Sequence, residues 1–325
     1  MGEQRKVEMA RITSMAERSA AKGQIDSSPS LPLIHTWSQL DSVDQLPPRI
    51  VWEKDGKEMV LIPAGAFTMG ISEDEAREIA SRWEIDEKWT LAETPQREVT
   101  LAAYYIDLTP VTQAEYGRFL KDNPEHRVPR VDEPWAGPFN WKENRRQPPE
   151  GLEQHPVVLV SWYDAQAYAL WSGKVLPSEE QWEKAARGSD GRDYPWGNMW
   201  DGKRLNSGER IAGRDFENIG DMHRWFDGLD TSKQAYTTAV NAYPAGASPY
   251  GLLDLAGNVW EWTASWFQAY PGSIAKHADF GEKCRVMRGG SWACSAFSIR
   301  SSFRRMNLPE FIDTNRGFRL ASTLF

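Results

Sequence analysis

The segment Leu176-Pro-Ser-Glu-Glu-Gln-Trp-Glu-Lys-Ala-Ala-Arg187 contains a clear signal for the start of a helix. Ser178 precedes Gln181 by three residues, which is the spacing of a capping box, in which each side chain bonds the backbone N–H of the other residue. Pro177 comes just before the cap, and good helix formers follow it. The sequence therefore predicts a helix that begins after Ser178.

The same start signal occurs twice earlier in the chain. Thr112 precedes Glu115, and Ser161 precedes Asp164, at the same spacing. We expect the helix after Ser161 to end at Gly173, because glycine readily adopts the left-handed conformation that closes many helices. Two further helices are therefore predicted.

Outside these helices, the chain from about residue 51 contains short apolar runs bounded by glycine, proline or asparagine. Residues 60–70 have the pattern of a strand pair with a Pro/Gly turn, and residues 97–107 that of another strand. Beyond Gly188 no long periodic helix is predicted, and residues 189–250 indicate long ordered loops. This mixture is typical of an α+β fold with few helices and many ordered loops.

The composition excludes several classes of function. The chain has 325 residues, and its 38 basic and 46 acidic side chains give a formal net charge of −8. This charge disfavours nucleic acid as the main partner, because phosphates require a basic surface. No window approaches the roughly 18 apolar residues of a membrane span, so no membrane association is predicted. Two cysteines and the lack of an apolar signal segment predict a reduced, cytoplasmic protein.

The N-terminal 50 residues are expected to form an extension to a single domain. Residues 3–22 contain helix formers with charges on all sides, and residues 27–32 are rich in serine and proline, as in linkers. We interpret residues 1–50 as a helix and a linker, either mobile or docked onto a partner. Residues 51–325 are expected to form one domain, because no second boundary is apparent.

A series of motifs rich in glycine, proline and tryptophan extends along this domain. They are Ile62-Pro-Ala-Gly-Ala-Phe-Thr-Met-Gly70, Pro110-Val-Thr-Gln-Ala-Glu-Tyr116, His155-Pro-Val-Val-Leu-Val-Ser-Trp162, Tyr194-Pro-Trp-Gly-Asn198, Gly257-Asn-Val-Trp-Glu-Trp262, Arg288-Gly-Gly-Ser-Trp292 and Gly317-Phe-Arg-Leu320. With the segment 176–187, and in this order, they closely resemble the formylglycine-generating-enzyme (sulfatase-modifying factor) superfamily. The resemblance implies a C-type-lectin-like α+β fold with a small twisted antiparallel sheet, few helices and many ordered loops.

Several functions occur in the superfamily that the chain resembles, so the fold alone does not decide the function. Members include copper-dependent oxidases that convert a sulfatase cysteine into formylglycine, iron-dependent sulfoxide synthases, non-catalytic paralogues and the variable ligand-binding proteins of diversity-generating retroelements. An iron site is not expected, because the five histidines are scattered and form no HxxxH or HxH pair.

The cysteine pattern bears on the copper oxidases. In those enzymes two cysteines five residues apart follow the Gly-Gly-Ser motif, and both thiolates hold Cu(I). Here Cys294 occupies the first position, but Ile299 occupies the second, and Cys284 lies upstream of the motif. Because Cu(I) prefers soft thiolate ligands, we expect no copper site. If the chain is an oxidase, Cys294 is the surviving ligand or a thiol that bonds the substrate.

The loop Asp254-Leu-Ala-Gly-Asn-Val-Trp-Glu261 resembles a calcium-binding loop of the family. The resemblance implies Asp254 and Glu261 as side-chain ligands, with main-chain carbonyls from Gly257 and Val259. Hard oxygen ligands on a glycine-containing turn suit Ca²⁺, which would stiffen the loop. We therefore expect a structural calcium ion, and the alternative is a solvated acidic loop.

Residues 293–315 match the stretch that forms the diversified binding surface of the retroelement proteins. Aromatic and arginine side chains displayed on a rigid frame are good recognition anchors, and Arg300, Ser301 and Arg304 have the character of frame residues. The predicted ligand-binding residues are Trp260, Ser291, Trp292, Ala293, Cys294, Ser295, Phe297, Phe303 and Arg305.

Two functional hypotheses follow. The first is a calcium-stabilised, non-copper member of the superfamily that binds a protein or a small molecule at this C-terminal face, and a retroelement-type variable protein is one form of it. The second is an oxygen-dependent oxidase of a cysteine or another thiol substrate.

Overall fold

The computed structural model of the chain describes residues 31–40 and 45–323. The helix predicted within residues 3–22 lies outside the described residues, and so does most of the predicted linker. None of the helices in the described part is long and apolar enough to cross a membrane.

The compact unit of the chain begins at Leu33, earlier than the boundary expected near residue 51. Ile34 and Leu40 are buried, and they pack in one apolar cluster with Trp52 and Met59. The indole N–H of Trp37 also donates a hydrogen bond to the main-chain oxygen of Gly173 at 3.1 Å. Residues just before the expected boundary therefore contribute to the core of the domain.

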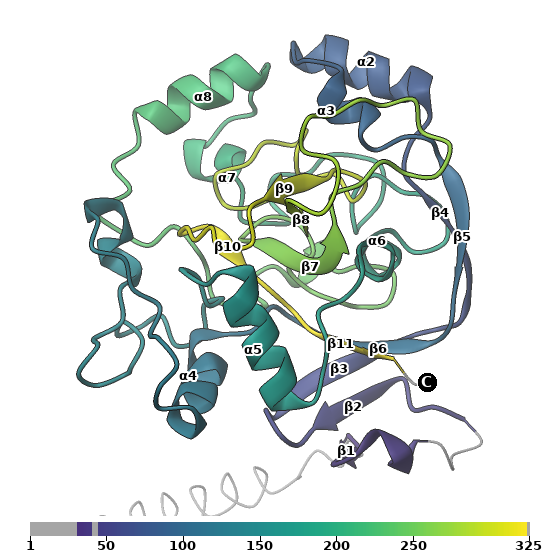
Figure 1. The fold of residues 1–325 in the computed structure, drawn as a ribbon. Coiled ribbons are helices and arrows are strands. Elements are labelled where there is room, and N and C mark those ends of the chain that lie inside the picture. The colour runs from purple at the N-terminus through teal and green to yellow at the C-terminus, as the bar shows by residue number, and fades with distance from the viewer. Residues whose placement is uncertain (1–30, 41–44, 324–325) are drawn as a thin grey trace, which may run out of the picture. The chain divides into compact units, whose positions relative to one another are not determined.

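A five-stranded sheet with the order β1-β2-β3-β6-β11 forms one end of the unit (Figure 1). The pair β1–β2 is parallel and the other neighbours are antiparallel. The strands are β1 (Leu33–Ile34), β2 (Arg49–Trp52), β3 (Lys57–Ile62), β6 (Tyr104–Asp107) and β11 (Ala321–Thr323). The C-terminal part of the chain is thus tied to strands from its first third.

Strands β3 and β6 continue into a second antiparallel pair, β4 (Gly65–Met69) and β5 (Arg97–Leu101). Pairing stops after Ile62 opposite Tyr104 and resumes at Gly65 opposite Leu101. Pro63 lies in this gap and has no N–H to donate to a ladder.

The strand pair predicted within residues 60–70 is therefore wrong, because β3 and β4 do not pair with each other. Each pairs instead with one half of residues 97–107, which form two strands and not the single strand expected. Alternating apolar residues identify strands, but the partner of each strand depends on how the ribbon folds in space.

A four-stranded sheet with the order β10-β7-β8-β9 lies in the interior. β10 runs parallel to β7, and the remaining pairs are antiparallel, so the sheet is mixed and not purely antiparallel as expected. The strands are β7 (Trp260–Trp266), β8 (Arg285–Arg288), β9 (Arg305–Asn307) and β10 (Arg316–Gly317).

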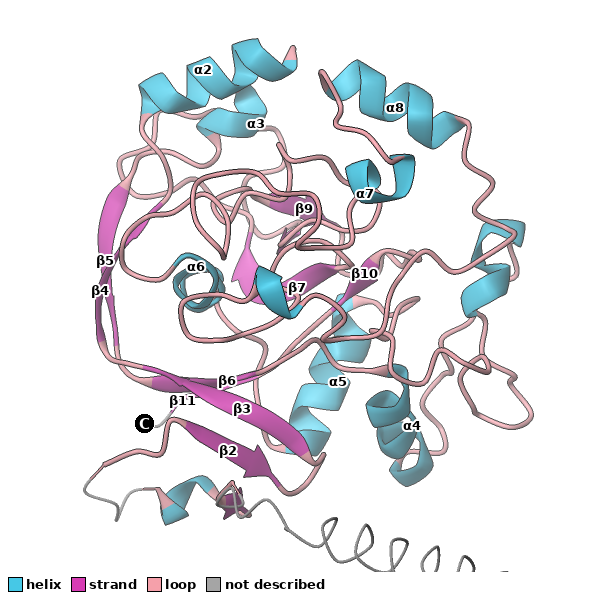
Figure 2. Cartoon of the chain, turned by 180° about the vertical axis from the view of Figure 1, so that it is seen from behind, coloured by secondary structure: helices cyan, strands magenta, loops and turns pink. Residues whose placement is uncertain are grey.

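The helices lie around these sheets (Figures 1 and 2). The α-helices are α2 (Glu73–Trp83), α3 (Lys88–Leu91), α4 (Gln113–Asp122), α5 (Trp162–Ser172), α6 (Glu179–Arg187), α7 (Gly208–Ala212) and α8 (Ile219–Asp227). Short 3-10 turns are η1 (Trp37–Gln39), η2 (Pro134–Phe139) and η3 (Pro244–Gly246). The expected α+β fold is confirmed.

The predicted starts of α4, α5 and α6 are confirmed, because each begins with a complete capping box. The helix α5 ends at Gly173, whose φ of 73° lies in the left-handed region, as expected. The helices α7 and α8, by contrast, lie where only loops were predicted. With five residues, α7 is too short to show an apolar repeat, and the repeat in α8 extends over only nine residues.

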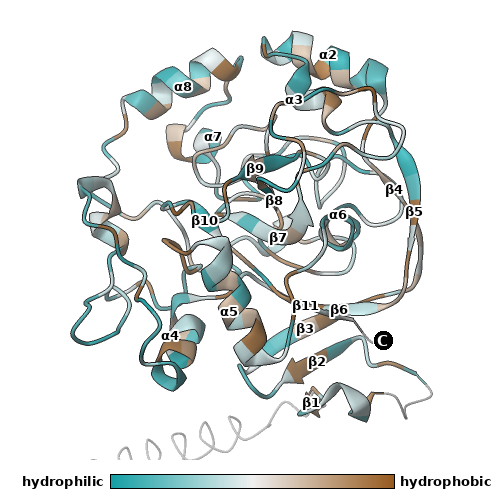
Figure 3. Cartoon of the chain, viewed as in Figure 1, coloured by the Kyte–Doolittle hydropathy of each residue, from teal (hydrophilic) through white to brown (hydrophobic). Residues whose placement is uncertain are grey.

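Helices α2, α3 and α8 lie at the end of the unit opposite the five-stranded sheet (Figures 1 and 2). Hydrophobic and hydrophilic residues are mixed along α2 and α8 (Figure 3), as in helices that cover a core with one face. The helix α6 lies between β4 on one side and β7 and β8 on the other.

Candidate functional site

A cavity of about 350 Å³, the apolar pocket, lies at the end of the unit that α8 and α2–α3 cover. Six residues of the predicted binding face line it, namely Trp260, Ala293, Cys294, Phe297, Phe303 and Arg305. Trp260 comes from the first residue of β7 and Arg305 from the first residue of β9, so the interior sheet positions two of the six. The structure thus brings together residues that are far apart in the sequence.

Three predicted residues do not line this pocket. Trp292 was predicted to bind the ligand, but the residue is 1% exposed and its ring stacks on that of Tyr236 with the ring centroids 5.0 Å apart. The hydroxyl of Ser291 and the thiol of Cys294 are hydrogen bonded at 3.3 Å. Ser295 is fully buried. Ser291, Trp292 and Ser295 therefore support the segment that forms the pocket and do not face its interior.

The predicted face is a pocket floor and not a displayed surface. Cys294, Phe297 and Phe303 are all buried. The expectation of exposed side chains fails because helix α8 and the turn between α2 and α3 lie over this segment. A ligand would therefore have to enter a pocket to reach these residues.

The covering residues were missed by the sequence analysis. Ile85 and Trp89 come from the α2–α3 region, and α8 contributes Ile219, Met222, His223 and Phe226. A signal for α8 was present, since Ile219, Met222 and Phe226 recur at helical spacing. In addition, the side chain of Asn218 caps the helix by accepting a hydrogen bond from the N–H of Asp221 at 2.9 Å.

Buried ion pairs fix the pocket floor to helix α6 and to the segment after α3. Arg304 donates to both carboxylate oxygens of Glu179, at 2.6 and 2.9 Å, and Arg288 pairs with Glu183. Arg300 donates to both oxygens of Glu93, at 2.7 and 2.9 Å. Such bidentate pairs have a defined geometry, so they place the intervening pocket residues precisely.

The surroundings of the two cysteines differ. Cys294 is buried in the main core cluster, and burial raises the pKa of its thiol. Ile299 is also fully buried in this cluster, and it lies against Gly290. Cys284 belongs to a separate cluster with Phe267 and Val286. The structure therefore does not bring Cys284 into the place of the cysteine that Ile299 replaces.

The predicted calcium loop has its two carboxylates in different environments. Glu261 accepts hydrogen bonds from Arg319 on both oxygens, at 2.7 Å each, and one from the indole of Trp182 at 2.7 Å. Asp254 accepts a hydrogen bond from the N–H of Asn241 at 2.8 Å, and burial raises the pKa of Asp254. Because Arg319 already neutralises Glu261, the carboxylates do not fit the full predicted ligand set in this structure.

The loop backbone is tightly packed as well. Gly257 has a φ of 74°, and a side chain there would lie 2.2 Å from the main-chain oxygen of Asn206. No group of three or more His, Cys, Asp or Glu side chains is arranged to hold a metal ion among residues 31–40 and 45–323. Calcium binding by this loop stays a prediction.

Comparisons with known proteins agree with this architecture. Residues 48–324 match the family described as "Sulfatase-modifying factor enzyme 1-like domain". "Inactive C-alpha-formylglycine-generating enzyme 2" of Bos taurus is 34% identical over 302 residues, which cover 81% of this chain and 87% of the bovine protein. "Formylglycine-generating enzyme" of Streptomyces coelicolor is 32% identical over 299 residues, which cover 81% and 88%. The chain is thus similar both to a protein named inactive and to one named as the enzyme.

A solved structure has the same fold. PvdO from Pseudomonas aeruginosa superposes with a TM-score of 0.60 and 25% identity, covering 85% of this chain and 99% of PvdO. The C-type-lectin-like fold implied by the motifs is therefore confirmed. Because the family match spans most of the residues and the relatives exceed 30% identity over most of their length, the chain belongs to the formylglycine-generating-enzyme (sulfatase-modifying factor) family.

Proposed function

We propose that this chain is a member of the family without copper oxidase activity, and that it binds a protein or small-molecule ligand in the apolar pocket. The observation that carries the proposal is Ile299, which is fully buried at the position of the second copper-binding cysteine. An isoleucine side chain offers no lone pair to a metal.

The surroundings of Ile299 support this proposal. A Cβ on Gly290 would lie 2.4 Å from the Cγ1 of Ile299, so the side chain fills the space beside the Gly-Gly turn. The thiol of Cys294 has a raised pKa because of its burial, which favours the protonated form, whereas metal ligation needs the thiolate. The relative named inactive, at 34% identity, agrees with a non-catalytic member.

The pocket walls indicate the chemistry of the ligand. Trp89, Trp260 and Phe303 provide aromatic surface, and the guanidinium of Arg305 lies 5.7 Å from the ring of Trp89. Large aromatic rings and arginine are the side chains that dominate binding energy at protein interfaces. We therefore propose a ligand that inserts an apolar group and presents a hydrogen-bond acceptor to Arg305.

An anaerobic Cu(I) titration, followed by oxygen uptake with a Cys-x-Pro-x-Arg peptide, tests the loss of oxidase activity. We expect neither stoichiometric copper binding nor turnover. The variant Ile299→Cys is the matched control, because it restores a second thiol and should bind Cu(I) more tightly than the wild type. Turnover by the wild-type protein would overturn the proposal and favour the oxidase hypothesis, and loss of that turnover in Cys294→Ser would confirm the oxidase.

The fluorescent anion 1-anilinonaphthalene-8-sulfonate tests the binding part, since it combines aromatic rings with an acceptor group. We expect Phe303→Leu and Arg305→Gln each to weaken probe binding. Arg130→Gln is the control, because Arg130 is an exposed arginine paired with Asp132 and does not line the pocket. Equal probe binding by all three variants would contradict a ligand site in this pocket.

We also propose a retroelement-type role and a cytoplasmic location for this protein. A retroelement role predicts a reverse transcriptase gene nearby with a near-copy of the sequence coding for residues 288–320. A cytoplasmic location predicts recovery of the protein in the soluble fraction of the cell with its cysteines reduced. A neighbouring sulfatase gene, without a near-copy of the sequence coding for residues 288–320, would favour the oxidase hypothesis instead.

A further inference from the structure

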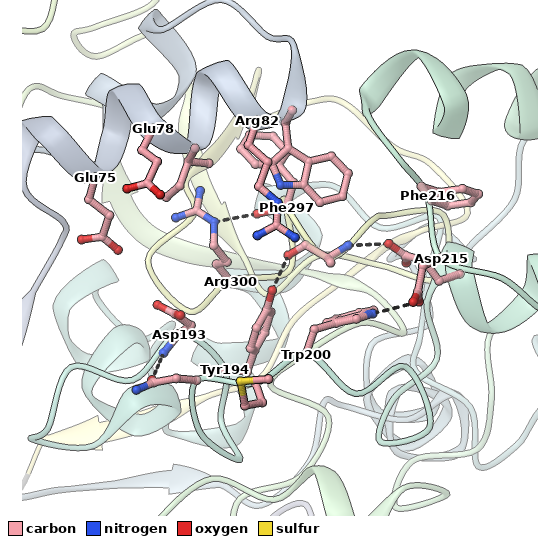
Figure 4. Close-up of a pocket in the computed structure, with 16 residues that line it drawn as sticks. Glu75, Glu78, Arg82, Asp193, Tyr194, Trp200, Asp215, Phe216, Phe297 and Arg300 are labelled. Atoms are coloured by element: carbon pink, nitrogen blue, oxygen red, sulfur yellow. Dashed lines mark hydrogen bonds between the residues drawn. The ribbon is translucent and has the colours of Figure 1, made fainter.

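A second cavity, of about 440 Å³, lies on the other side of the segment that forms the floor of the apolar pocket. We call it the acidic pocket, and Phe297 lines both cavities. Figure 4 shows Glu75, Glu78 and Arg82 projecting into it from α2, with Asp193 and Tyr194 on the opposite side. Of the nine predicted ligand-binding residues only Phe297 lines it, although Ala296 and Arg300 from the predicted stretch 293–315 line it too.

Carboxylates outnumber cations in this pocket. The carboxylates are Glu75, Glu78, Asp193, Glu209 and Asp215, and the cations are Arg82 and Arg300. The charge of Arg300 is already paired, because both of its terminal nitrogens donate hydrogen bonds to the carboxylate of Glu93. Arg82 is exposed to solvent at the rim. The interior of the pocket therefore has an excess of negative charge.

Glu209 is the buried carboxylate of this group. Its side chain is 3% exposed, and its Oε1 accepts a hydrogen bond from the N–H of Ala296 at 2.7 Å. Its Oε2 is buried and has no hydrogen-bond partner within the described parts of the chain. Burial raises the pKa of Glu209 to about 7. A buried carboxylate oxygen without a partner costs free energy, so the site is incomplete without a donor.

Two more carboxylates face each other across the pocket. Burial raises the pKa of Glu75, and the charge of Asp193 adds to this effect. Neither side chain forms an ion pair with a described residue, whereas neighbouring charges in the core are paired. A cation between Glu75 and Asp193 would relieve their repulsion.

The walls between these carboxylates are aromatic. Trp83, Tyr194, Trp200, Phe216 and Phe297 line the pocket. The indole N–H of Trp200 donates to Asp215 at 3.3 Å, and the Tyr194 hydroxyl donates to the main-chain oxygen of Ala296 at 3.1 Å. Aromatic faces attract organic cations, and the attraction increases where water is excluded.

We propose that the acidic pocket binds an organic cation, a guanidinium or an alkylammonium group, with Glu209 as its buried anchor. A metal ion fits less well, because no group of three His, Cys, Asp or Glu side chains is arranged to hold one among residues 31–40 and 45–323. The acidic pocket is a different cavity from the apolar pocket, so cation binding here does not depend on whether the apolar pocket binds a ligand.

Calorimetric titration of the whole protein tests this site. The probes are agmatine and tetramethylammonium, with a neutral alkyl alcohol of similar size as the negative control. We expect both cations to bind and Glu209→Gln to weaken them by about tenfold or more, as for the loss of a charge-assisted hydrogen bond. Asp74→Asn is the matched control, because it removes a fully exposed carboxylate from α2 outside the pocket.

The source of the cation can be distinguished in the same experiment. A peptide with one internal arginine should bind better than the same peptide with citrulline if the pocket takes a side chain of a partner. A free small molecule is indicated if agmatine binds and the peptide does not. The proposal is overturned if no cation binds, or if Glu209→Gln and Asp74→Asn behave alike. If Glu209→Gln does not fold, Asp193→Asn replaces it with the same expectations.

The pH dependence gives a second readout. A bound cation favours the ionised form of Glu209, so the affinity should be about tenfold higher at about pH 8 than at about pH 6. The charged groups that face Glu209 across the pocket are Glu75, Glu78, Arg82, Asp193, Asp215 and Arg300. Glu209→Gln should remove most of this dependence, whereas an unchanged dependence in that variant would contradict the role of Glu209.

Discussion

Two adjoining regions of this molecule contain buried charges, the core beside α6 and the acidic pocket, and they differ in how those charges are satisfied. Beside α6, Glu183 accepts hydrogen bonds from the N–H of Gly70 and from Arg187 at 2.8 and 2.9 Å, and it also pairs with Arg288. In the acidic pocket, Oε1 of Glu209 accepts a hydrogen bond from the N–H of Ala296, but its Oε2 has no hydrogen-bond partner among the described residues.

The pKa values show the same difference. Burial opposes ionisation of Glu183, but the charges of Arg288 and Arg187 outweigh it and lower its pKa. Burial of Glu209 is not compensated in this way, and its pKa rises to about 7. A paired buried charge such as that of Glu183 thus belongs to the framework, whereas the oxygen of Glu209 without a partner is the feature on which the proposed cation site rests.

We expect the largest change in the free energy of unfolding from a substitution in the core beside α6. Glu183→Ala removes the buried carboxylate with which Arg187 and Arg288 both form ion pairs, so we expect a loss of about 3–5 kcal/mol in the free energy of unfolding. Denaturant unfolding measures it. Glu180→Gln, on the same helix, is the control, because its pair with Arg97 is partly exposed and should contribute less than about 1 kcal/mol. Similar losses in both variants would remove the distinction between framework and surface pairs.

Removal of the carboxylate charge in the acidic pocket should stabilise the protein, in contrast to its removal at Glu183. The folded-state pKa of Glu209 is raised from 4.5 to about 7, so the folded protein holds an extra proton between these pH values. Its stability should therefore fall as the pH rises through this window. Glu209→Gln should stabilise the protein at about pH 8 by on the order of 1–3 kcal/mol, and this gain should vanish at about pH 4.

Thermal and denaturant unfolding across this pH range check the prediction, with Asp74→Asn as the control. A destabilised Glu209→Gln protein at high pH would show that Glu209 is a framework residue like Glu183. Addition of a binding cation should reverse the order of stability between the wild type and this variant, because only the wild type gains the ion pair.

We expect a smaller effect on stability at the loop 254–261. In this loop Glu261 is paired with Arg319, whereas Asp254 accepts a hydrogen bond from a backbone N–H. If the predicted calcium site forms, calcium at about ten times its dissociation constant should add about 1.4 kcal/mol, and a chelator should remove the gain. Asp254→Asn should abolish the response. Alanine at Glu261 would mislead, because Arg319 would lose its partner whether or not calcium binds. A melting temperature insensitive to both calcium and chelator would remove the calcium hypothesis.

Much of the architecture could be predicted because it depends on local chemistry. The capping boxes at Thr112, Ser161 and Ser178 contain both partners within four residues, so no other part of the chain has to be known. The order of the motifs was likewise sufficient to predict the family. The isoleucine at position 299, in place of a second cysteine, was sufficient to question copper binding. Six residues of the predicted face also meet in the apolar pocket.

Other features depended on the tertiary structure, because they require knowledge of which distant segments meet. The burial of the predicted binding face results from α8 and the α2–α3 turn, which are far from it in sequence. The partners of β3 and β4 are β6 and β5, which helices α2 and α3 separate from them in the sequence. The sequence contains the carboxylates of Glu75, Asp193 and Glu209, but whether a charge is paired depends on what surrounds it in space. The contact of Glu183 with Arg187 follows from their i,i+4 spacing on α6, but only the fold decided that Glu183 also meets Arg288 while Glu209 keeps one oxygen without a partner among the described residues.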